Sequence, residues 1–370
     1  MKKQKIVALS FYINRIGDLT DDFFTPNAQG CAASQRLQLT PALLSAKKAG
    51  HQVCVKSLHC KNPNDITSLG NYDICIVGKL SANSDELAQS MAVANLAAIT
   101  QLKANGTKIV ILYCDHQLID GYTIGSLYRT IFKLADFIIY PTSYLQRAGQ
   151  KHAGENSKSF LIADPWSIKA FNIPRPSPGK GTWKIIWLGS NKNLQYLLNI
   201  LPYLYRSHLS KKRIELNLLT GSWAIKKFKK FTSIHPCPGN WRIRLTEWSG
   251  SRQPEQLEQE LIQSHISIIP SDPTDPQKAG ASHNRLVDSV RAGCLTLASP
   301  LESYKELSKI CLLGKDFTTL LSHAIHDYDR LITKHSLHRK SILAQFSPEI
   351  NSAKWDKALK IITEDNQKIV

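Results

Sequence analysis

Short apolar, β-branched runs alternate with longer amphipathic stretches along the N-terminal half of the chain. The runs typical of buried strands lie at 6–11, 52–57, 73–77, 108–113, 137–140 and 159–162. Patterns with helical spacing cover 34–49 and 85–104 between them. Strands that alternate with helices pair in parallel and need helices on both faces of their sheet. This half of the chain therefore predicts a doubly wound α/β domain.

The alternation stops at a stretch rich in proline and glycine, which includes the sequence IPRPSPGKG, and then starts again. The later strand-like runs lie at 183–188, 214–218, 266–269 and 295–298. A chain of 370 residues also exceeds the usual size of a single core. We therefore predict two doubly wound Rossmann-like domains. The expected ranges are an N-terminal domain at 1–165, a linker at 166–182, a second domain at 183–346, and a C-terminal helix at 347–370 that packs back on the first domain.

The charge of the chain is strongly positive and unevenly distributed. The formal net charge is +18, and ten Lys or Arg residues but a single acid, Glu215, lie between Arg206 and Arg244. Such a patch attracts anions: nucleotides, nucleic acid or an anionic membrane face. Within it, residues 223–231 interleave aromatic side chains with four lysines, which suits a bilayer surface, although a solvated face is the first interpretation of such a run. Nucleic acid is the disfavoured partner, because no recognition motif accompanies the patch.

Cysteine usage and hydropathy indicate the compartment. The eight cysteines include no C-x-x-C pair, which argues against a zinc or redox site and for a reducing environment. The apolar run near the N-terminus is too short for a signal peptide, and no segment reaches the ~18 to 20 apolar residues of a membrane span. We expect a cytoplasmic protein without a metal site. The basic patch adds the expectation of peripheral contact with the inner membrane face.

In the N-terminal half, candidate chemistry follows two of the predicted strands. Parallel sheets bind ligands beyond the carboxyl ends of their strands. The strand at 108–113 runs into Asp115 and His116, so His116 is a candidate to bond a sugar hydroxyl or to carry a proton. The alternative is that Asp115 caps a turn and His116 is a bystander. The loop after the first strand is either a ligand loop or a surface insertion, and its polar residues are Arg15, Gly17, Asp18, Gly30, Ser34 and Arg36.

In the second half, the strand at 183–188 runs into Gly189, Ser190 and Asn191, where a small turn and a helix start suit a phosphate or serve capping alone. A second set of candidates surrounds the helix predicted to follow 266–269. Arg285 and Lys278 suit a diphosphate, and the alternative is that Arg285 pairs with Asp288. The other polar candidates in this region are Ser282, Asn284, Asp288 and Glu302.

Two segments resemble a known family of enzymes. Residues 37–53, LQLTPALLSAKKAGHQV, resemble the first helix and the Gly-His-x-Val entry of group 1 glycosyltransferases. Residues 288–299, DSVRAGCLTLAS, resemble the family segment E-A-x-A-x-G-x-P-V-V-A-S. On this alignment Asp288 stands at the second Glu of the E-x7-E motif, which contacts the donor ribose, while Gly280 occupies the position of the first Glu. The resemblance implies the GT-B fold, in which two Rossmann-like domains face a cleft.

The resemblance also implies an activity. It predicts a retaining, metal-independent hexosyltransferase of the kind found in cell-surface polysaccharide biosynthesis. The nucleotide-diphosphate sugar would bind mainly in the C-terminal domain and a carbohydrate or lipid-linked acceptor mainly in the N-terminal domain, with no further cofactor. His116 matches the family histidine that lies near the transferred sugar. Alternatives are a GT-B-like epimerase or phosphorylase, and a non-catalytic nucleotide-sugar-binding or scaffold protein.

Overall fold

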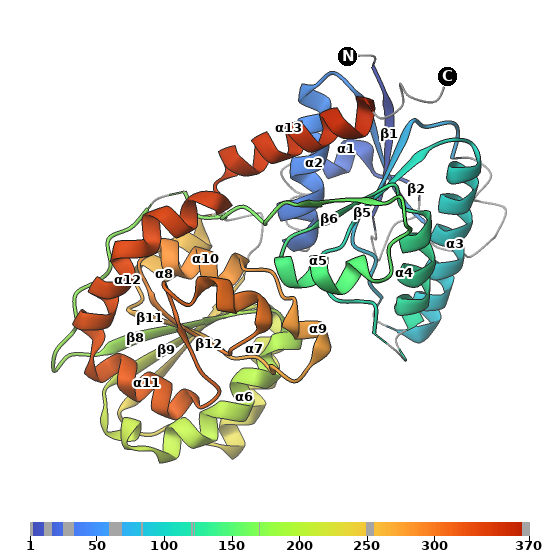
Figure 1. Cartoon of the computed structure of the whole chain (residues 1–370). Helices are drawn as coiled ribbons and strands as arrows, with labels where there is room; N and C mark the ends of the chain where they lie inside the picture. Colours follow the sequence, from blue (N-terminus) through green and yellow to red (C-terminus); the bar gives the residue numbers. More distant parts are fainter. Residues whose placement is uncertain are drawn as a thin grey trace. The chain divides into compact units, whose positions relative to one another are not determined.

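The strand-like runs form two separate sheets in a computed structural model of the chain (Figure 1). The structure describes residues 3–10, 17–24, 33–58, 69–82, 84–119, 121, 123–169, 171–248 and 255–364. Two compact units contain one sheet each. Unit 1 comprises Met1–Pro165, Gly280–Ser282 and Pro348–Val370, and unit 2 comprises Trp166–Ala279 and His283–Ser347. The predicted fold class, two doubly wound α/β architectures, is confirmed.

The sheet of unit 1 has the strand order β2-β3-β1-β4-β5-β6-β7. Its six longer strands run parallel, and the two-residue strand β2 joins β3 antiparallel at the edge. The strands are β1 Lys5–Leu9, β2 Gly17–Asp18, β3 Gln52–Ser57, β4 Ile74–Val77, β5 Lys108–Leu112, β6 Phe137–Tyr140 and β7 Lys158–Leu161. β4, β5 and β6 are buried along their whole length, which explains why their sequences are continuous apolar runs.

Helices cover both faces of this sheet because neighbouring strand residues point to opposite sides. The helical elements of unit 1 are α1 Thr20–Phe23, the π-helical turn η2 Gln35–Leu39, α2 Thr40–Lys48, α3 Asp85–Ala104, α4 Thr123–Leu134, α5 Ser143–Gln150 and α13 Pro348–Glu364. On one face, Val7 packs with Met91 of α3 and Ile131 of α4. On the other, Ile6 packs with Leu43 of α2 and Trp355 of α13. The predicted return of the C-terminal helix to the first domain is confirmed by α13, drawn in red beside α2 (Figure 1).

The sheet of unit 2 has the order β10-β9-β8-β11-β12-β13, with every pair parallel. The strands are β8 Trp183–Leu188, β9 Ile214–Thr220, β10 Trp241–Glu247, β11 Ile266–Ile269, β12 Leu295–Ala298 and β13 Leu312–Leu313. The hydrophobic pattern did not predict β10. Its sequence WRIRLTE alternates charged with apolar residues, as an edge strand does.

Two layers of helices cover this second sheet. The helical elements are α6 Asn191–Arg206, η4 His208–Lys211, α7 Ser222–Ile234, α8 Gln256–Ile262, α9 Pro276–Ala279, α10 Asn284–Arg291, η6 Glu302–Leu307, α11 Phe317–His326, α12 Tyr328–Leu343 and η7 Ala344–Phe346. Leu197 of α6, Phe228 of α7 and Leu321 of α11 belong to the core on one face. Leu261 of α8 and Ala292, which follows α10, belong to the core on the other.

Residues 166–182, predicted as a linker, count with unit 2 and are fixed to the end of α10. The Arg291 guanidinium donates to the carbonyl oxygens of Ile168 and Lys169, at 3.0 and 2.6 Å. Gly293 has φ +94°, and a Cβ there would lie 2.9 Å from the Ile173 carbonyl oxygen. Only glycine combines this backbone conformation with so close an approach. The proline-rich segment therefore has a defined path on unit 2.

Candidate functional site

The carboxyl end of β8 forms the first part of a polar edge in unit 2. A Cβ on Gly189 would lie 2.8 Å from Cζ2 of Trp187, so this turn needs glycine for packing as well as for any ligand. Ser190 is the exposed N-cap of α6, but its side chain makes no capping hydrogen bond. Exposed Asn191 begins α6, and its Oδ1 lies 3.6 Å from where a Cβ on Gly221, the N-cap of α7, would be. Two helix starts without side-chain caps thus lie close together here.

Lys278 extends from α9 to the same edge. Its Nζ lies 3.3 Å from Oδ1 of Asn193 and 5.7 Å from the centre of the Tyr196 ring, both on α6. The Tyr196 hydroxyl donates to Oδ2 of Asp275 at 3.2 Å. Burial, together with the nearby carboxylates of Asp275 and Asp272, raises the pKa of Tyr196 to about 12. Tyr196 therefore stays a neutral hydrogen-bond donor near neutral pH, and its ring supports the lysine.

Arg285 reaches the edge from the first turn of α10. Its Nη1 lies 3.5 Å from the carbonyl oxygen of Leu188, the last residue of β8. The alternative that Arg285 pairs with Asp288 is not realised, because Asp288 is buried and its Oδ1 accepts from the Ser167 backbone N–H at 2.7 Å. Within the described ranges, Arg285 has no carboxylate at ion-pair distance. Its guanidinium is therefore held by a neutral oxygen.

Two further candidates of unit 2 have partners of their own. Asn284 begins α10, and its Oδ1 accepts from the Arg285 backbone N–H at 2.7 Å. Glu302 follows β12 and lies 2.6 Å from Nζ of Lys305 in an exposed pair. The structure thus places Lys278, Arg285 and the 189–191 turn on one edge of the sheet. The binding roles predicted for Asn284, Asp288 and Glu302 stay predictions.

Ser282 differs from its neighbours in sequence because it counts with unit 1. Its hydroxyl donates to Oδ2 of the buried residue Asp164. Oδ1 of the same carboxylate accepts from Nε2 of Gln38 on η2 at 2.6 Å. The predicted contact of Ser282 with a phosphate is untested, and the bond that the structure gives it is to a carboxylate.

Gly280, the position of the first Glu in the E-x7-E motif, has no room for a side chain. It also counts with unit 1, where a Cβ would lie 2.5 Å from Cδ2 and 2.7 Å from Cγ of Leu145 on α5. Real Cβ atoms essentially never come so close to a neighbour. The close packing of Leu145 therefore explains why the motif glutamate is replaced by glycine at position 280.

In unit 1, His116 is held in one tautomer by Tyr113. The Tyr113 hydroxyl oxygen accepts from the backbone N–H groups of Gln117 and Leu118, at 2.9 and 3.1 Å. Its single proton is therefore available for Nδ1 of His116, 2.9 Å away. Burial, with a smaller effect of His152, lowers the pKa of His116 below its usual value of 6.5. The neutral ring then carries its proton on Nε2, so His116 presents a hydrogen-bond donor rather than a base.

The other polar residues at this edge of unit 1 also have internal partners. Lys79, after β4, forms an ion pair with Asp115 after β5. Nε2 of Gln117 donates to the Leu80 carbonyl oxygen at 2.9 Å. In the long loop after β1, Asp18 caps α1 through Thr20, while Arg15 and Gly30 lie outside the described residues.

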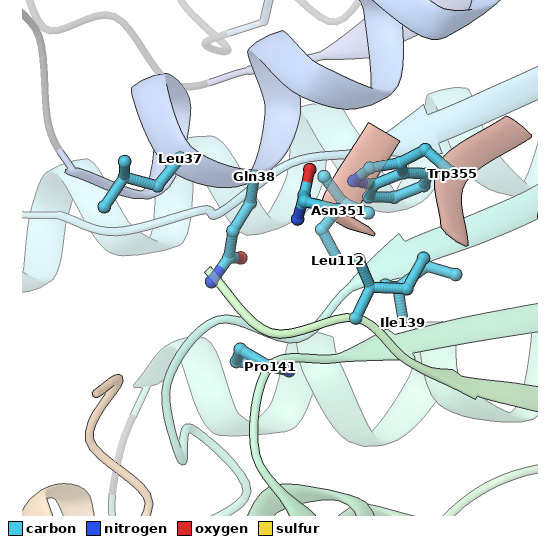
Figure 2. Close-up of a pocket in the computed structure, with 8 residues that line it drawn as sticks. Leu37, Gln38, Leu112, Ile139, Pro141, Asn351 and Trp355 are labelled. Atoms are coloured by element: carbon cyan, nitrogen blue, oxygen red, sulfur yellow. The ribbon is translucent and has the colours of Figure 1, made fainter. Parts of the chain in front are cut away.

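A small cavity lies between η2 and α13, with Gln38, Asn351 and Trp355 in its lining (Figure 2). Its volume is about 10 Å³, which is room for about one water molecule and far too little for a sugar ring. The buried indole Nε1 of Trp355 has no protein hydrogen-bond partner among the described residues. One water at this position would satisfy it.

Metal and membrane features were sought in the same described ranges. There, no three His, Cys, Asp or Glu side chains lie close enough together to hold a metal ion. No helix in those ranges combines the length and apolarity needed to cross a bilayer. The basic stretch of unit 2 is a surface feature, in which most of the Lys and Arg side chains are exposed, together with Trp223 at 56 % and Ile234 at 67 % exposure.

The sequence matches no protein-family model and no curated protein. Solved structures match over nearly the whole chain. Anabaena HepE in complex with UDP and glucose has a TM-score of 0.65 at 11 % identity, covering 96 % of this chain and 99 % of HepE. The chain has the GT-B fold. A second GT-B structure is sucrose-phosphate synthase from Thermosynechococcus elongatus, with a TM-score of 0.64 at 11 % identity, covering 98 % of this chain and 100 % of that protein. A third is the lipopolysaccharide outer core galactosyltransferase WaaB, with a TM-score of 0.55 at 12 % identity, covering 96 % of this chain and 99 % of WaaB.

Several residues that shape the site within this GT-B fold were not singled out from the sequence. Asn193 and Tyr196 orient Lys278. The sequence could have indicated both, because they lie three and six residues after Ser190 on a helix that starts at the sheet edge. Tyr113 and Asp164 carried no such signal. Tyr113 belongs to an apolar run, and the partners of Asp164 lie more than 100 residues away along the chain.

Proposed function

We propose that the protein is a glycosyltransferase that moves a sugar from a nucleotide-diphosphate donor to an acceptor hydroxyl. The observation that carries the proposal is the pair of cations, Lys278 and Arg285, at one edge of the unit 2 sheet beside the start of α6. A planar guanidinium and a compact ammonium suit the oxygens of a diphosphate, and helix starts add backbone N–H donors.

The two cations would act mainly on the leaving group. When the bond from the sugar C1 to the diphosphate oxygen breaks, the diphosphate keeps the electron pair, C1 bonds to the acceptor oxygen, and the proton of the acceptor hydroxyl passes to the departing diphosphate. Positive groups fixed near that developing charge stabilise the transition state more than the ground state. In this proposal they do so without a metal ion or a further cofactor, and the configuration at C1 is retained, as the group 1 resemblance implies.

The donor proposal also draws on structures with the same fold. HepE was crystallised with UDP and with UDP-glucose, which favours a uridine nucleotide as the first donor to test. Sucrose-phosphate synthase and the galactosyltransferase WaaB differ in the products that their names imply, so the fold leaves the acceptor open. We propose a carbohydrate or lipid-linked acceptor for this chain.

His116 has a defined part in this proposal. With its proton on Nε2 and its pKa lowered by burial, the ring suits donation of a hydrogen bond to a sugar hydroxyl. It does not suit removal of a proton, because Nδ1 already accepts from Tyr113. The earlier alternative of His116 as a proton carrier is therefore the weaker one.

A donor panel tests the proposal. Purified protein is incubated with UDP-glucose, UDP-galactose, UDP-N-acetylglucosamine and GDP-mannose, and release of nucleoside diphosphate is followed with and without sugar acceptors. We expect turnover with one donor and a loss of its affinity by about 10- to 100-fold in Arg285→Ala, as for a lost charged hydrogen bond. Arg330→Ala, at an exposed pair with Asp327 on α12, is the matched control. No turnover, with unchanged affinity in Arg285→Ala, would overturn the proposal.

The same panel separates the alternatives. Tight binding without turnover supports a nucleotide-sugar-binding protein. Conversion of one nucleotide sugar into its epimer supports an epimerase, and release of a sugar phosphate on addition of inorganic phosphate supports a phosphorylase.

We also propose that the exposed basic face of unit 2 contacts anionic lipid. On α7, Trp223 is exposed, and Lys226, Lys229 and Lys230 are exposed along the same helix. An interfacial tryptophan beside lysines suits a headgroup layer. Vesicles containing phosphatidylglycerol should retain the protein at 20 mM salt and release it at 500 mM. Retention that is independent of salt, or preference for RNA over vesicles, would contradict this contact.

A further inference from the structure

The chain that follows β12, residues 299–303, is tied to two other segments of unit 2. At its start, the Ser299 hydroxyl accepts from the Ser271 backbone N–H and donates to the Ser271 carbonyl oxygen, both at 2.8 Å. At its end, the Ser303 carbonyl oxygen accepts from Nε2 of His283 at 2.8 Å. Ser299, Ser303 and His283 are at most 3 % exposed. These bonds are therefore shielded from water, where a hydrogen bond gains strength.

The imidazole of His283 can only be the donor in its bond. A carbonyl oxygen accepts, so Nε2 must carry the proton. Burial lowers the pKa of His283, although the field of Glu306 and the bond to Ser303 oppose that effect. The ring also packs against aromatic neighbours, with its centre 5.4 Å from that of Phe346 and 6.4 Å from that of Tyr304. His283 is therefore a neutral, oriented ring whose single proton holds Ser303.

The two segments that loop 299–303 joins carry the proposed phosphate ligands. One follows β11 and leads to α9 with Lys278. The other begins at His283, directly before α10, which carries Arg285 two residues later. The direct chain path between the two cations runs through Gly280–Ser282, which counts with unit 1. Loop 299–303 is thus a connection between the two segments that lies entirely within unit 2, at the carboxyl edge of its sheet.

We propose that His283 is a positioning residue: by holding the Ser303 carbonyl oxygen, it fixes the start of α10 against loop 299–303 and thereby places Arg285 relative to Lys278. His283 acts through Ser303 and touches no substrate. The consequence for donor binding rests on the proposed function, whereas the attachment of the loop to the α10 start does not.

Hydrogen exchange of the apo protein tests this attachment directly. The Tyr304 backbone N–H, next to Ser303, donates to the Leu301 carbonyl oxygen at 2.9 Å. In His283→Leu, which is similar in volume but has no donor, this turn should open more often. We expect the protection of the Tyr304 N–H, relative to the amides of β8, to fall about tenfold, as for one lost hydrogen bond.

A matched pair of amides separates hydrogen bonding from packing. His283→Gln can donate from its own Nε2 at nearly the same place and should recover most of the protection at Tyr304. His283→Asn is shorter by one methylene, does not reach the Ser303 oxygen, and should behave like His283→Leu. Unchanged protection in both His283→Leu and His283→Asn, or a loss that His283→Gln fails to recover, would overturn the proposal.

His265 provides a control for the general stability of unit 2. It is also buried, at 4 % exposure, but it precedes β11 and so lies at the amino edge of the same sheet. Its Nδ1 accepts from the Lys184 backbone N–H at 3.0 Å. His265→Leu should therefore lower the melting temperature about as much as His283→Leu does, while the affinity for UDP stays unchanged.

Binding of UDP provides the functional measurement. Affinity should fall about tenfold in His283→Leu and recover in His283→Gln. In the Arg285→Ala background, His283→Leu should cause no further loss, because no guanidinium is left to position. A further tenfold loss in that background would show that His283 does not act through Arg285, and the proposed positioning would be wrong.

The two measurements distinguish the attachment from the donor proposal. If the Tyr304 N–H responds as expected and UDP does not bind at any concentration, the attachment stands and the uridine donor fails. If UDP binds equally well to the natural protein and to His283→Leu, the link between His283 and the donor site is wrong.

Discussion

The carboxyl edges of the two sheets share a parallel topology but distribute their polar bonds differently. In unit 1, charged and polar side chains pair with one another: Lys79 with Asp115, Tyr113 with His116, and Gln38 with Asp164. In unit 2, Lys278 and Arg285 contact the neutral oxygens of Asn193 and Leu188.

This difference predicts that the polar groups of one edge contribute mainly to stability and those of the other mainly to ligand binding. An edge whose polar groups bond one another loses stability when one partner is removed, because the other partner stays buried and unsatisfied. Arg285 has no carboxylate at ion-pair distance in the described ranges, so its guanidinium still has most of its charge to offer to an anion. Substitutions that leave a partner unsatisfied at the unit 1 edge should therefore lower stability, while replacing Arg285 at the unit 2 edge should lower ligand affinity and leave stability nearly unchanged.

Gly280 should give the largest effect, because unit 1 has no space at that position. Gly280→Glu, which restores the motif residue, places a Cβ 2.5 Å from Cδ2 of Leu145. We expect a loss of more than about 3 kcal/mol in the free energy of unfolding, and a smaller loss for Gly280→Ala, since overpacking alone costs ~1 to 3 kcal/mol. Calorimetry measures both.

Gly239→Ala is the matched control for this pair, since a Cβ there meets nothing within 4 Å. Its melting temperature should stay within about 2 °C of that of the natural protein. An unchanged melting temperature in Gly280→Ala would show that α5 can yield, and the packing explanation for the missing glutamate would fail.

Gly280 also illustrates how far the sequence alone could lead. The alternation of short apolar runs with helical patterns predicted both sheets, because strands buried on both faces must be apolar throughout. The same rule missed β10, whose charged residues alternate, and the two-residue strands β2 and β13, which are too short for any pattern.

The residues of the candidate site could be predicted only where neighbouring positions in the sequence indicate their role. Lys278 and Arg285 were found from charge near a helix start, and the 189–191 turn from glycine after a strand. The bonds of Ser282 and Asp288, to Asp164 and the Ser167 backbone, join residues more than 100 positions apart. No local pattern encodes such pairs, so a phosphate or ribose contact was the natural expectation.

Asp164→Asn should produce a stability change of about 3 kcal/mol that depends on pH. The folded-state pKa of Asp164, about 6, lies above the usual 3.8, so the folded protein binds the proton more tightly than the unfolded chain. Stability from this group is present below pH 4 and is lost as pH rises to 6, by about 3 kcal/mol for a shift of roughly two units. Asparagine has no charge to bury, so the variant should be the more stable protein above pH 6.

Denaturation between pH 4 and 7 measures this difference. Asp316→Asn provides a control with the opposite sign, because the Thr319 hydroxyl and nearby backbone N–H groups lower the pKa of Asp316. Its removal should cost stability above pH 4 rather than add it. A constant difference between Asp164→Asn and the natural protein over this range would mean that Asp164 does not titrate there.

Tyr113→Phe should lower the free energy of unfolding by about 2 kcal/mol. The variant removes the acceptor of the Gln117 and Leu118 backbone N–H groups, which are buried. It also frees Nδ1 of His116, so the pKa of His116 should move upward, toward 6.5, in an NMR titration. Tyr144→Phe, on the ring 6.0 Å from His116, is the control and should change neither quantity appreciably. A His116 pKa that stays low in Tyr113→Phe would show that burial alone holds the ring neutral.

Arg285→Met should have the smallest effect on stability and is for that reason the sharpest test of the comparison. The guanidinium has one long contact, 3.5 Å to the Leu188 carbonyl oxygen, and methionine keeps most of the apolar stem. We expect the unfolding free energy to change by at most about 0.5 kcal/mol while UDP-glucose affinity falls about 10- to 100-fold. Arg330→Met, which breaks only the exposed pair with Asp327, should match it in stability but keep most of the affinity. If Arg285→Met instead destabilised unit 2 as strongly as Tyr113→Phe destabilises unit 1, the guanidinium would be a structural group, and the two sheet edges would not differ in kind.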